Sequence, residues 1–194
     1  MQGYRACMFA ALGSRGNEAI AVARSVGGTA YVANDGQREP VFGALVVGDD
    51  RRVLEGVADI GLYRVQVRPM RHQRRFWSQG DATPGVTAAF GMLRHPSLAH
   101  EQSDAHWRDT HAPLALRHHP GMWHYHQVSI DEVLDGRFYD GVALCAFASE
   151  QELKERFFGG LDDQQIIRDD VATFADTTNS PRRVRMTEWR FGAE

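Results

Sequence analysis

The order of strands and helices occurs twice along the chain, and this repeat constrains the fold more than any single motif. In the first half, apolar periodicity predicts strands at residues 4–12, 29–33, 41–47 and 62–68, with helices at 17–25 and 51–58. In the second half it predicts strands at 86–93, 122–130, 139–147 and 183–191, with helices at 100–117, 150–157 and 164–174. Both halves follow the strand–helix–strand–strand–helix–strand order of ferredoxin-like α+β proteins.

Short segments of similar sequence recur at matching places in the two halves. Residues 42–47 resemble residues 140–145, and residues 63–68 resemble residues 182–187. Because these similarities keep the same order, they indicate an internal duplication. A polar segment containing Gly80 and Pro84 separates the halves. We therefore expect a degenerate ferredoxin-like half at 1–78, a linker at 79–84 and a second ferredoxin-like half at 85–194.

Each half would form a sheet that helices cover on one face only. The other face is apolar, and an exposed apolar face would associate with another surface. Packing the two halves sheet to sheet buries both faces within one chain. We therefore expect an α+β fold in which two βαββαβ halves form an α/β barrel, and this reasoning leaves open whether two such chains form a homodimer.

Charge and composition exclude several classes of protein. The net charge of −3 argues against nucleic-acid binding, which usually needs a basic surface. We interpret one basic cluster as a solvated connector in preference to a phosphate-binding arm. It comprises Arg68, Arg71, Arg74 and Arg75. The chain has no apolar run of about 18 residues and no signal-peptide pattern, so we expect no membrane partner and a cytoplasmic location.

Cysteine and lysine chemistry is limited as well. Cys7 and Cys145 each lie in an apolar run, which is typical of small buried hydrophobes and not of a disulfide or a metal site. Lys154 is the only lysine, so a Schiff base could form nowhere else. Phosphate-binding loops and a nucleophile elbow are missing from the sequence. The arginine-rich usage is typical of a GC-rich genome, and we expect a bacterial source.

Eight of the nine histidines fall between His95 and His126, so any chemistry should be concentrated there. On the predicted helix, steps of four, three and four residues place one stripe against the sheet. The stripe comprises Trp107, His111, Leu114 and His118. Pro113 removes a backbone donor, so the helix must end, kink or restart near His111. An irregularity there would aim the His111 side chain into a cavity.

The strand that follows places imidazoles on one face and aromatic rings on the other. Period-two alternation puts His124 and His126 on one face, and Trp123 and Tyr125 on the opposite face. Both faces are covered in a barrel with helices outside. The alternation therefore leaves open which face lines a cavity.

The histidine segment resembles a known family, the EthD-domain proteins of the dimeric α/β-barrel superfamily. The resemblance covers residues 85–191 and rests on a Trp-x-x-x-His-x-Pro-Leu helix, a Pro-Gly turn and a Tyr-bearing strand. The matching segments are residues 95–96, 103–107, 110–114, 120–122, 125–127 and 139–143. The first half lacks the Trp and His motif, so it is similar to a degenerate copy that completes the barrel.

This resemblance implies a small-molecule site between helix and sheet. Relatives include monooxygenases without a cofactor, cyclases, dehydratases, decarboxylases and isomerases, as well as members without known activity. It implies a hydrophobic, oxygenated substrate, aromatic or polyketide-like, and no bound cofactor. By similarity we carry over His111 as a catalytic residue, with Trp107 and Tyr125 as substrate-binding residues. Tyr139 and His95, which lie in matching segments, complete the expected binding set.

Alternative interpretations remain for the same residues. His111 is either a general acid or base, or a structural residue that bonds a carbonyl group freed by Pro113. His124 and His126 are further catalytic candidates, but two imidazoles on one strand face could also chelate zinc, iron or copper. His118 and His119 add metal candidates, yet no carboxylate lies at ligand spacing with them. We therefore expect no metal, and the function is either a cofactor-independent enzyme or a non-catalytic binding protein.

Overall fold

The computed structural model describes residues 8–72 and 77–192. In its first half the elements are β1 (Met8–Gly13), α1 (Gly16–Ser25), β2 (Thr29–Ala33), β3 (Ala44–Gly48), α2 (Arg51–Leu54), the 3₁₀ turn η1 (Glu55–Val57) and β4 (Gly61–Arg71). In its second half they are β5 (Val86–Met92), α3 (His100–His106), the π-helical turn η2 (Trp107–His111), α4 (Ala112–His118), β6 (Met122–Gly136), β7 (Gly141–Phe147), α5 (Glu150–Glu155), α6 (Leu161–Phe174) and β8 (Val184–Arg190). Cys7, Arg74 and Arg75 lie outside the described residues.

The strands close into one barrel in the order β1-β3-β2-β8-β5-β7-β6-β4, and every neighbouring pair is antiparallel. The first four strands lie in the order β4-β1-β3-β2, and the last four lie in the equivalent order β8-β5-β7-β6. Two seams join these sets, β2 with β8 and β4 with β6. The predicted fold, two ferredoxin-like halves that form a barrel, is therefore the observed one.

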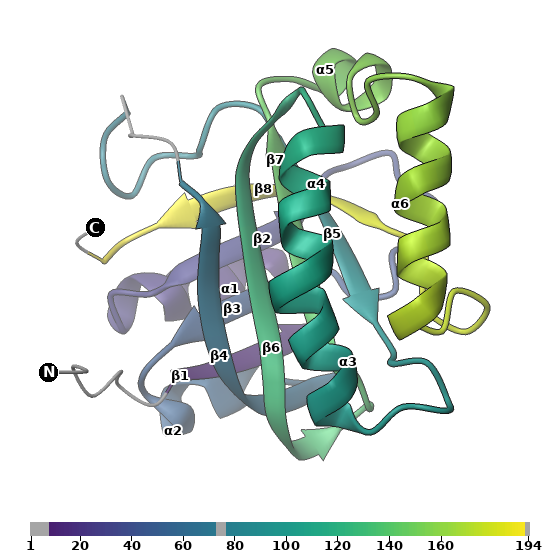
Figure 1. The fold of residues 1–194 in the computed structure, drawn as a ribbon. Helices are drawn as coiled ribbons and strands as arrows, with labels where there is room; N and C mark the ends of the chain where they lie inside the picture. Colours follow the sequence, from purple (N-terminus) through teal and green to yellow (C-terminus); the bar gives the residue numbers. More distant parts are fainter. Residues whose placement is uncertain (1–7, 73–76, 193–194) are drawn as a thin grey trace, which may run out of the picture.

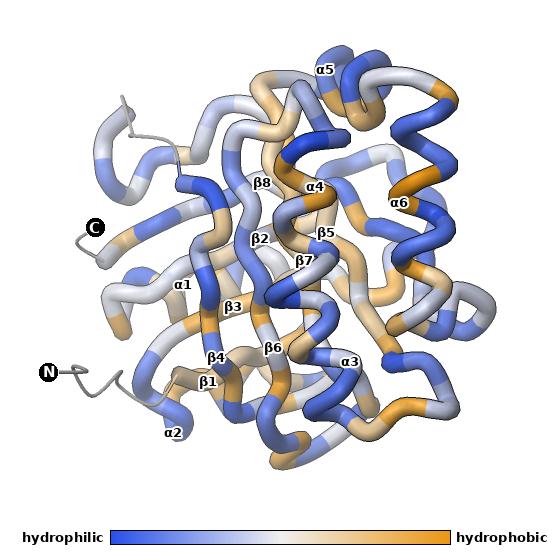
Figure 2. The backbone as a smooth tube through the Cα atoms, viewed as in Figure 1, coloured by the Kyte–Doolittle hydropathy of each residue, from blue (hydrophilic) through white to orange (hydrophobic). Residues whose placement is uncertain are grey.

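Helices cover the outside of the barrel in two groups (Figure 1). The first group, α1 and α2, packs on the strands of the first half, where small residues such as Ala19 and Ala23 are fully buried. The second group, α3, α4 and α6, packs on β5, β6 and β7. Figure 2 shows that α6 alternates apolar and polar residues along its length, as a helix with one buried face does. In the part of the chain that the structure describes, no helix is long and apolar enough to cross a membrane.

Side chains from both halves fill the barrel interior, which we call the lumen. Its apolar core includes Leu12, Tyr31, Tyr63, Val128 and Met186, which come from five different strands. Alternate residues of the same strands point outward into the layers beneath the helices. The strands of the second half therefore border two separate packed regions. Their inner face borders the lumen, and their outer face borders the layer beneath the helices.

Two predictions about local structure need correction. The basic cluster is not a solvated connector at Arg68 and Arg71, because β4 continues through both residues and pairs with β6. Arg68 is buried and forms a bidentate ion pair with Asp104 at 2.7 and 2.9 Å. Arg71 donates hydrogen bonds to two backbone carbonyl oxygens. The strand predicted at 122–130 is also longer than expected, because β6 ends at Gly136, which still pairs with β4.

Candidate functional site

A cavity of about 290 Å³ lies on the helix-covered face of the second half. Its floor comes from β5, β6 and β7, and its walls come from η2, α4 and α6. Most of the lining is apolar, including Phe90, Met92, Ala143, Phe157, Ile167, Val171 and Phe174. The polar side chains at its walls include His111, His119 and Tyr125. A largely apolar cavity with a few polar groups, near the lower end of the usual range of ~300–1,000 Å³, is typical of a small-molecule site.

His111 is oriented by a carboxylate that reaches it from α6. The Nδ1 atom of His111 lies 2.7 Å from Oδ2 of Asp170, and the ring packs on Phe174. His106 shares the same carboxylate, with its Nε2 atom 2.8 Å from Oδ1. Burial alone would raise the pKa of Asp170, but the hydrogen bonds and electrostatic effects of the two histidines hold it below its usual range. An ionised carboxylate only accepts hydrogen bonds, so Nδ1 of His111 carries the proton and Nε2 is the basic nitrogen.

The helical segment that carries Trp107 and His111 contains a π-helical turn just before Pro113. Pro113 has no N–H, and its ring would clash with the carbonyl group one turn earlier, so the helix widens over Trp107–His111 before it resumes as α4. The predicted irregularity at His111 is therefore confirmed. Ala115, four residues after His111 in α4, also lines the cavity.

His119 follows the last residue of α4, where the backbone has left helical geometry, and it reaches the cavity wall, whereas His118 of the predicted stripe does not. Its Nδ1 atom bonds the carbonyl oxygen of Phe157, and its ring packs on Phe157 and Phe158. Burial lowers the pKa of His119 to about 4, although the bond to Phe157 opposes this shift. His119 is therefore neutral at neutral pH. His118 instead pairs with Asp163, at 2.6 Å between Nδ1 and Oδ1.

Trp107 and Tyr125 lie side by side in the cavity wall and are held by a hydrogen-bond network. The Tyr125 hydroxyl oxygen accepts bonds from Nε1 of Trp107 at 3.0 Å and from Nε2 of Gln127 at 3.1 Å. Gln127 also donates to the carbonyl oxygen of Trp107 at 2.9 Å. Burial raises the pKa of Tyr125 well above its usual value, so it stays protonated. No described residue accepts the proton of its hydroxyl group, which is therefore available to a ligand in the cavity.

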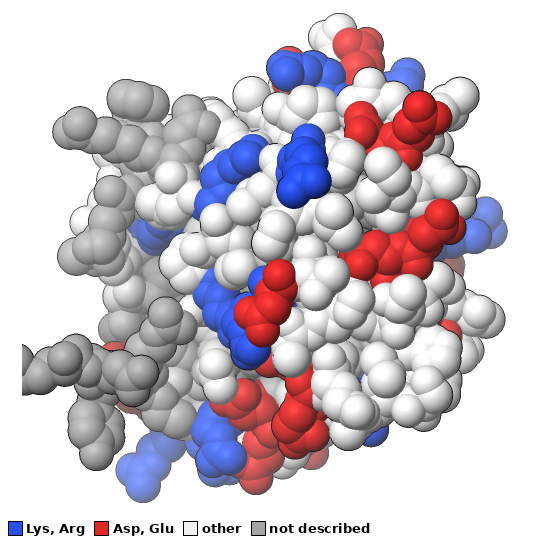
Figure 3. All heavy atoms as spheres, viewed as in Figure 1, with Lys and Arg blue, Asp and Glu red and all other residues white. Residues whose placement is uncertain are grey.

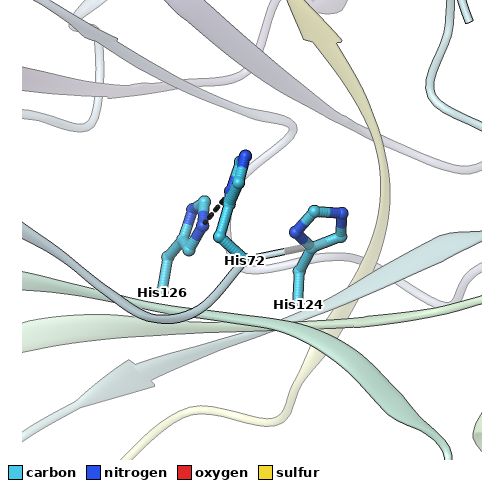
Figure 4. A group of neighbouring side chains, drawn as sticks. All are labelled: His72, His124 and His126. Carbon is cyan, nitrogen blue, oxygen red and sulfur yellow. Dashed lines mark hydrogen bonds between the residues drawn. The ribbon is translucent and has the colours of Figure 1, made fainter. Parts of the chain in front are cut away.

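His124 and His126 lie in the lumen, on the opposite side of β6 from Tyr125. They alternate with Tyr125 along β6 and share a strand face with Val128, which belongs to the lumen core. His72, directly after β4, lies between the two rings (Figure 4). Burial and the nearby positive charge of Arg190 lower the pKa of His126 to about 4, against the opposing effect of Glu188. The structure therefore does not bring His124 and His126 together with His111.

Two expected binding residues also lie away from the cavity. Tyr139 belongs to the lumen core, and its buried hydroxyl group has no hydrogen-bond partner among the described residues. His95 is half-buried in the loop after β5, with Nδ1 at 2.7 Å from the Ser97 hydroxyl group. Of the predicted site residues, the cavity collects His111, Trp107 and Tyr125.

Sequence reasoning missed Asp170 and His119 at this site and His72 in the lumen. A signal for Asp170 was present, because Asp163, Ile167, Asp170 and Phe174 follow helical spacing and share one face of α6. That face carries two carboxylates toward the histidine-bearing helix, and Figure 3 shows acidic side chains gathered over α6. No comparable signal existed for His72, which is 52 residues before His124 in the sequence.

Comparison with solved structures places this architecture in a known fold class. The crystal structure of an anthrone oxidase-like protein superposes with a TM-score of 0.54 over 100% of this chain and 97% of the other, at 10% sequence identity. A protein from Lactobacillus acidophilus NCFM, named for a proposed monooxygenase activity, superposes less well, with a TM-score of 0.49 over 97% of both chains and 9% identity. The chain therefore has an α+β barrel of the dimeric α/β-barrel type. No family model and no curated protein matches the sequence, and membership of the EthD family stays a prediction.

Proposed function

We propose that this chain is an enzyme that moves a proton on a small, hydrophobic, oxygen-bearing substrate held in the helix-side cavity. The observation that carries the proposal is the pair of His111 and Asp170, at 2.7 Å, in the wall of an apolar cavity of about 290 Å³. An imidazole with a fixed tautomer beside an apolar cavity is the arrangement of a general base.

In the proposed reaction, Nε2 of His111 removes a proton from an acidic C–H or O–H group of the substrate. The ring then becomes an imidazolium ion, and the carboxylate of Asp170 stabilises its charge through Nδ1. Asp170 is a positioning residue, because it acts through His111. General base catalysis of this type contributes about 10²–10⁴-fold to a rate.

Tyr125 complements this base on the substrate oxygen. Its hydroxyl oxygen already accepts two hydrogen bonds, so its proton points to a further acceptor. A carbonyl oxygen that becomes an enolate when His111 removes the neighbouring proton is such an acceptor. Donors placed where negative charge develops stabilise the transition state. The substrate class is therefore an aromatic or polyketide-like ketone, and the reaction an isomerisation, cyclisation, elimination or oxygenation that begins with proton removal.

Cys145 and His119 complete the cavity without acting as nucleophiles. Burial raises the pKa of the Cys145 thiol to about 12, so it is neutral and unreactive at neutral pH. His119 is also neutral, and its Nδ1 atom is already bonded to a backbone carbonyl oxygen. These properties favour His111 over either residue as the group that reacts.

An anthrone-type ketone is the first substrate to test, because a solved structure of the same fold is named for anthrone oxidation. Anthrone and O₂ would give anthraquinone and water, with O₂ taking up the electrons after the base removes a proton. The assay follows oxygen consumption and quinone absorbance with the purified chain. Other aromatic ketones are tested in the same way by loss of substrate or by exchange of the acidic proton with deuterium.

His111→Gln separates catalysis from binding, and His118→Gln is the matched control. Both histidines lie on the same helical segment, and each bonds a carboxylate of α6 through Nδ1. We expect H111Q to lose turnover by about 10²–10⁴-fold while ligand affinity changes little, and H118Q to retain activity. A non-catalytic binding protein, the alternative that the strongly apolar lining favours, would instead bind these ketones without converting or exchanging them.

A further inference from the structure

Three imidazoles converge at one end of the lumen, separate from the helix-side cavity. His124 and His126 come from the inward face of β6, and His72 follows the end of β4. These strands are neighbours, and Pro69 of β4 pairs with His126 of β6, so the topology brings the three residues together. One ring nitrogen of each histidine lies within 4.8 Å of the other two (Figure 4).

The spacing of these nitrogens suits a shared metal ion better than a hydrogen bond. Nδ1 of His72 lies 3.4 Å from Nε2 of His126. An N–H···N bond is normally shorter, at about 2.7–3.2 Å. Two imidazole nitrogens on one zinc ion, each at about 2.05 Å in tetrahedral geometry, lie about 3.3 Å apart. The His72–His126 pair is therefore already at ligand spacing, and a nitrogen of His124 lies within 4.8 Å of both, so a shift of at most about 1.5 Å brings it to the same spacing.

The surroundings of the cluster are compatible with a divalent cation. His124 and His126 are only 5% and 9% exposed, whereas His72 is exposed, so an ion could enter from the His72 side. The charged side chains closest to His126 are Glu188 and Arg190, which form an ion pair at 2.7 Å. Because their charges offset each other, the lumen neither repels a cation nor supplies a carboxylate in place of an imidazole.

We propose that His72, His124 and His126 form a metal site for a divalent transition-metal cation, with zinc as the best-matched ion. Imidazole nitrogen is a ligand that zinc, copper, nickel and cobalt prefer, whereas magnesium and calcium prefer oxygen. Three protein ligands leave a fourth position for water or an anion, which is the ligand count of catalytic zinc sites and not of closed structural ones. This site reverses our expectation from the sequence, which was that the chain holds no metal.

Glu188 lies near this site but is not one of its ligands. Its carboxylate accepts hydrogen bonds from Thr83 at 2.8 Å, from Arg190 at 2.7 Å and from Tyr31 at 3.2 Å. These three donors fix the carboxylate and leave it unsuited to move onto the ion. Its negative charge offsets the positive charge of Arg190 beside His126.

The test is a zinc titration of the full-length chain without a polyhistidine tag. The chain is first stripped with a chelator, and zinc is then added in competition with a chromophoric chelator. We expect one zinc ion per chain, a higher melting temperature with zinc, and visible d–d bands of an imidazole-bound ion when cobalt(II) replaces zinc. Magnesium should produce none of these effects.

Variants of the three ligands then locate the ion. His72→Gln, His124→Gln and His126→Gln should each weaken zinc binding by at least about 100-fold, since loss of an outer partner alone costs about 10–100-fold. His118→Gln, which removes a histidine with a carboxylate partner elsewhere, should bind zinc as the wild type does. His72 is exposed, so H72Q keeps the test decisive even where a buried substitution prevents folding. Less than one zinc ion per wild-type chain, or unchanged affinity in H72Q, would overturn the proposal.

Discussion

The two faces of β6 carry similar side chains but lie in different surroundings. The outward face presents Tyr125 to a cavity in whose wall His111 is bonded to a carboxylate at 2.7 Å. The inward face presents His124 and His126 to the lumen, where Nε2 of His126 lies 3.4 Å from Nδ1 of His72. A carboxylate partner prepares an imidazole for proton transfer, whereas converging imidazoles prepare a metal site. One strand therefore supports two kinds of chemistry, and each can be disturbed without the other.

The largest expected effect on the outward face is that of Asp170→Asn. An amide does not hold Nδ1–H of His111 as a carboxylate does, and it leaves the imidazolium without a counter-charge, so we expect kcat to fall about 100-fold or more with little change in KM. Steady-state kinetics on a converted ketone measures both constants, and Asp163→Asn serves as the matched control.

A purely structural role for Asp170 would give a different result. In that case D170N would lower the melting temperature and change kcat and KM together, and Asp170→Glu would not restore the rate. If the sites on the two faces of β6 are independent, D170N should bind zinc as the wild type does. Loss of zinc from D170N would show that the two sites are coupled.

The next effect is a pH dependence of stability that arises on the outward face. The pKa of His119 is about 4 in the folded chain against 6.5 for a free histidine. Between these values the unfolded chain binds a proton that the folded chain does not, so stability is full above pH ~6.5 and falls toward pH ~4, by about 3 kcal/mol. Urea unfolding of zinc-free protein from pH 7 to pH 4 measures this loss. His119→Gln should remove that part of the slope, and an identical slope in the variant would contradict the assignment.

A smaller effect is expected for Tyr125→Phe. The substitution removes the oxygen that accepts bonds from Trp107 and Gln127, and it leaves the buried Trp107 N–H without its partner. We expect a loss of about 1–3 kcal/mol in the free energy of unfolding. Chemical denaturation gives the value, and a result close to zero would mean that another acceptor replaces the hydroxyl group.

The smallest effect is expected for Tyr139→Phe, the corresponding change in the lumen. The hydroxyl group of Tyr139 is buried without a partner among residues 8–72 and 77–192. Removing it should cost nothing and could stabilise the fold by up to about 1 kcal/mol, because a buried unpaired hydroxyl group is unfavourable. The two tyrosines thus form a matched pair, and a large loss in Y139F would reveal a polar contact in the lumen.

Much of the fold could be predicted because its determinants are local. The predicted helix at 17–25 and strand at 29–33 coincide with α1 and β2 within one residue. The identical strand order of the two halves agrees with the predicted repeat, although the duplication itself stays a prediction. Pro113 also acted locally, since its missing N–H determines where the helix departs from regular geometry.

The site was only partly predictable because its partners are distant in sequence. Helical spacing placed Trp107 and His111 on one face, and both line the cavity, but it put His118 in the same stripe and gave no place to His119. His119 lies beyond the last residue of α4, and the periodicity of a helix says nothing about a residue that follows its end. Asp170 reaches His111 across 59 residues, and no periodicity links the two.

By itself, the sequence determined the order of the strands and helices, that the helix changes at Pro113, and that eight of the nine histidines lie in the second half. The first two properties depend on backbone preferences and on the period of apolar residues, which act over a few neighbouring residues. Tertiary structure alone decided that the histidine face of β6 points into the lumen and the tyrosine face points to the cavity. Alternation makes the two faces of a strand equivalent until other elements cover them, so only the closure of the barrel and the docking of α6 could distinguish them.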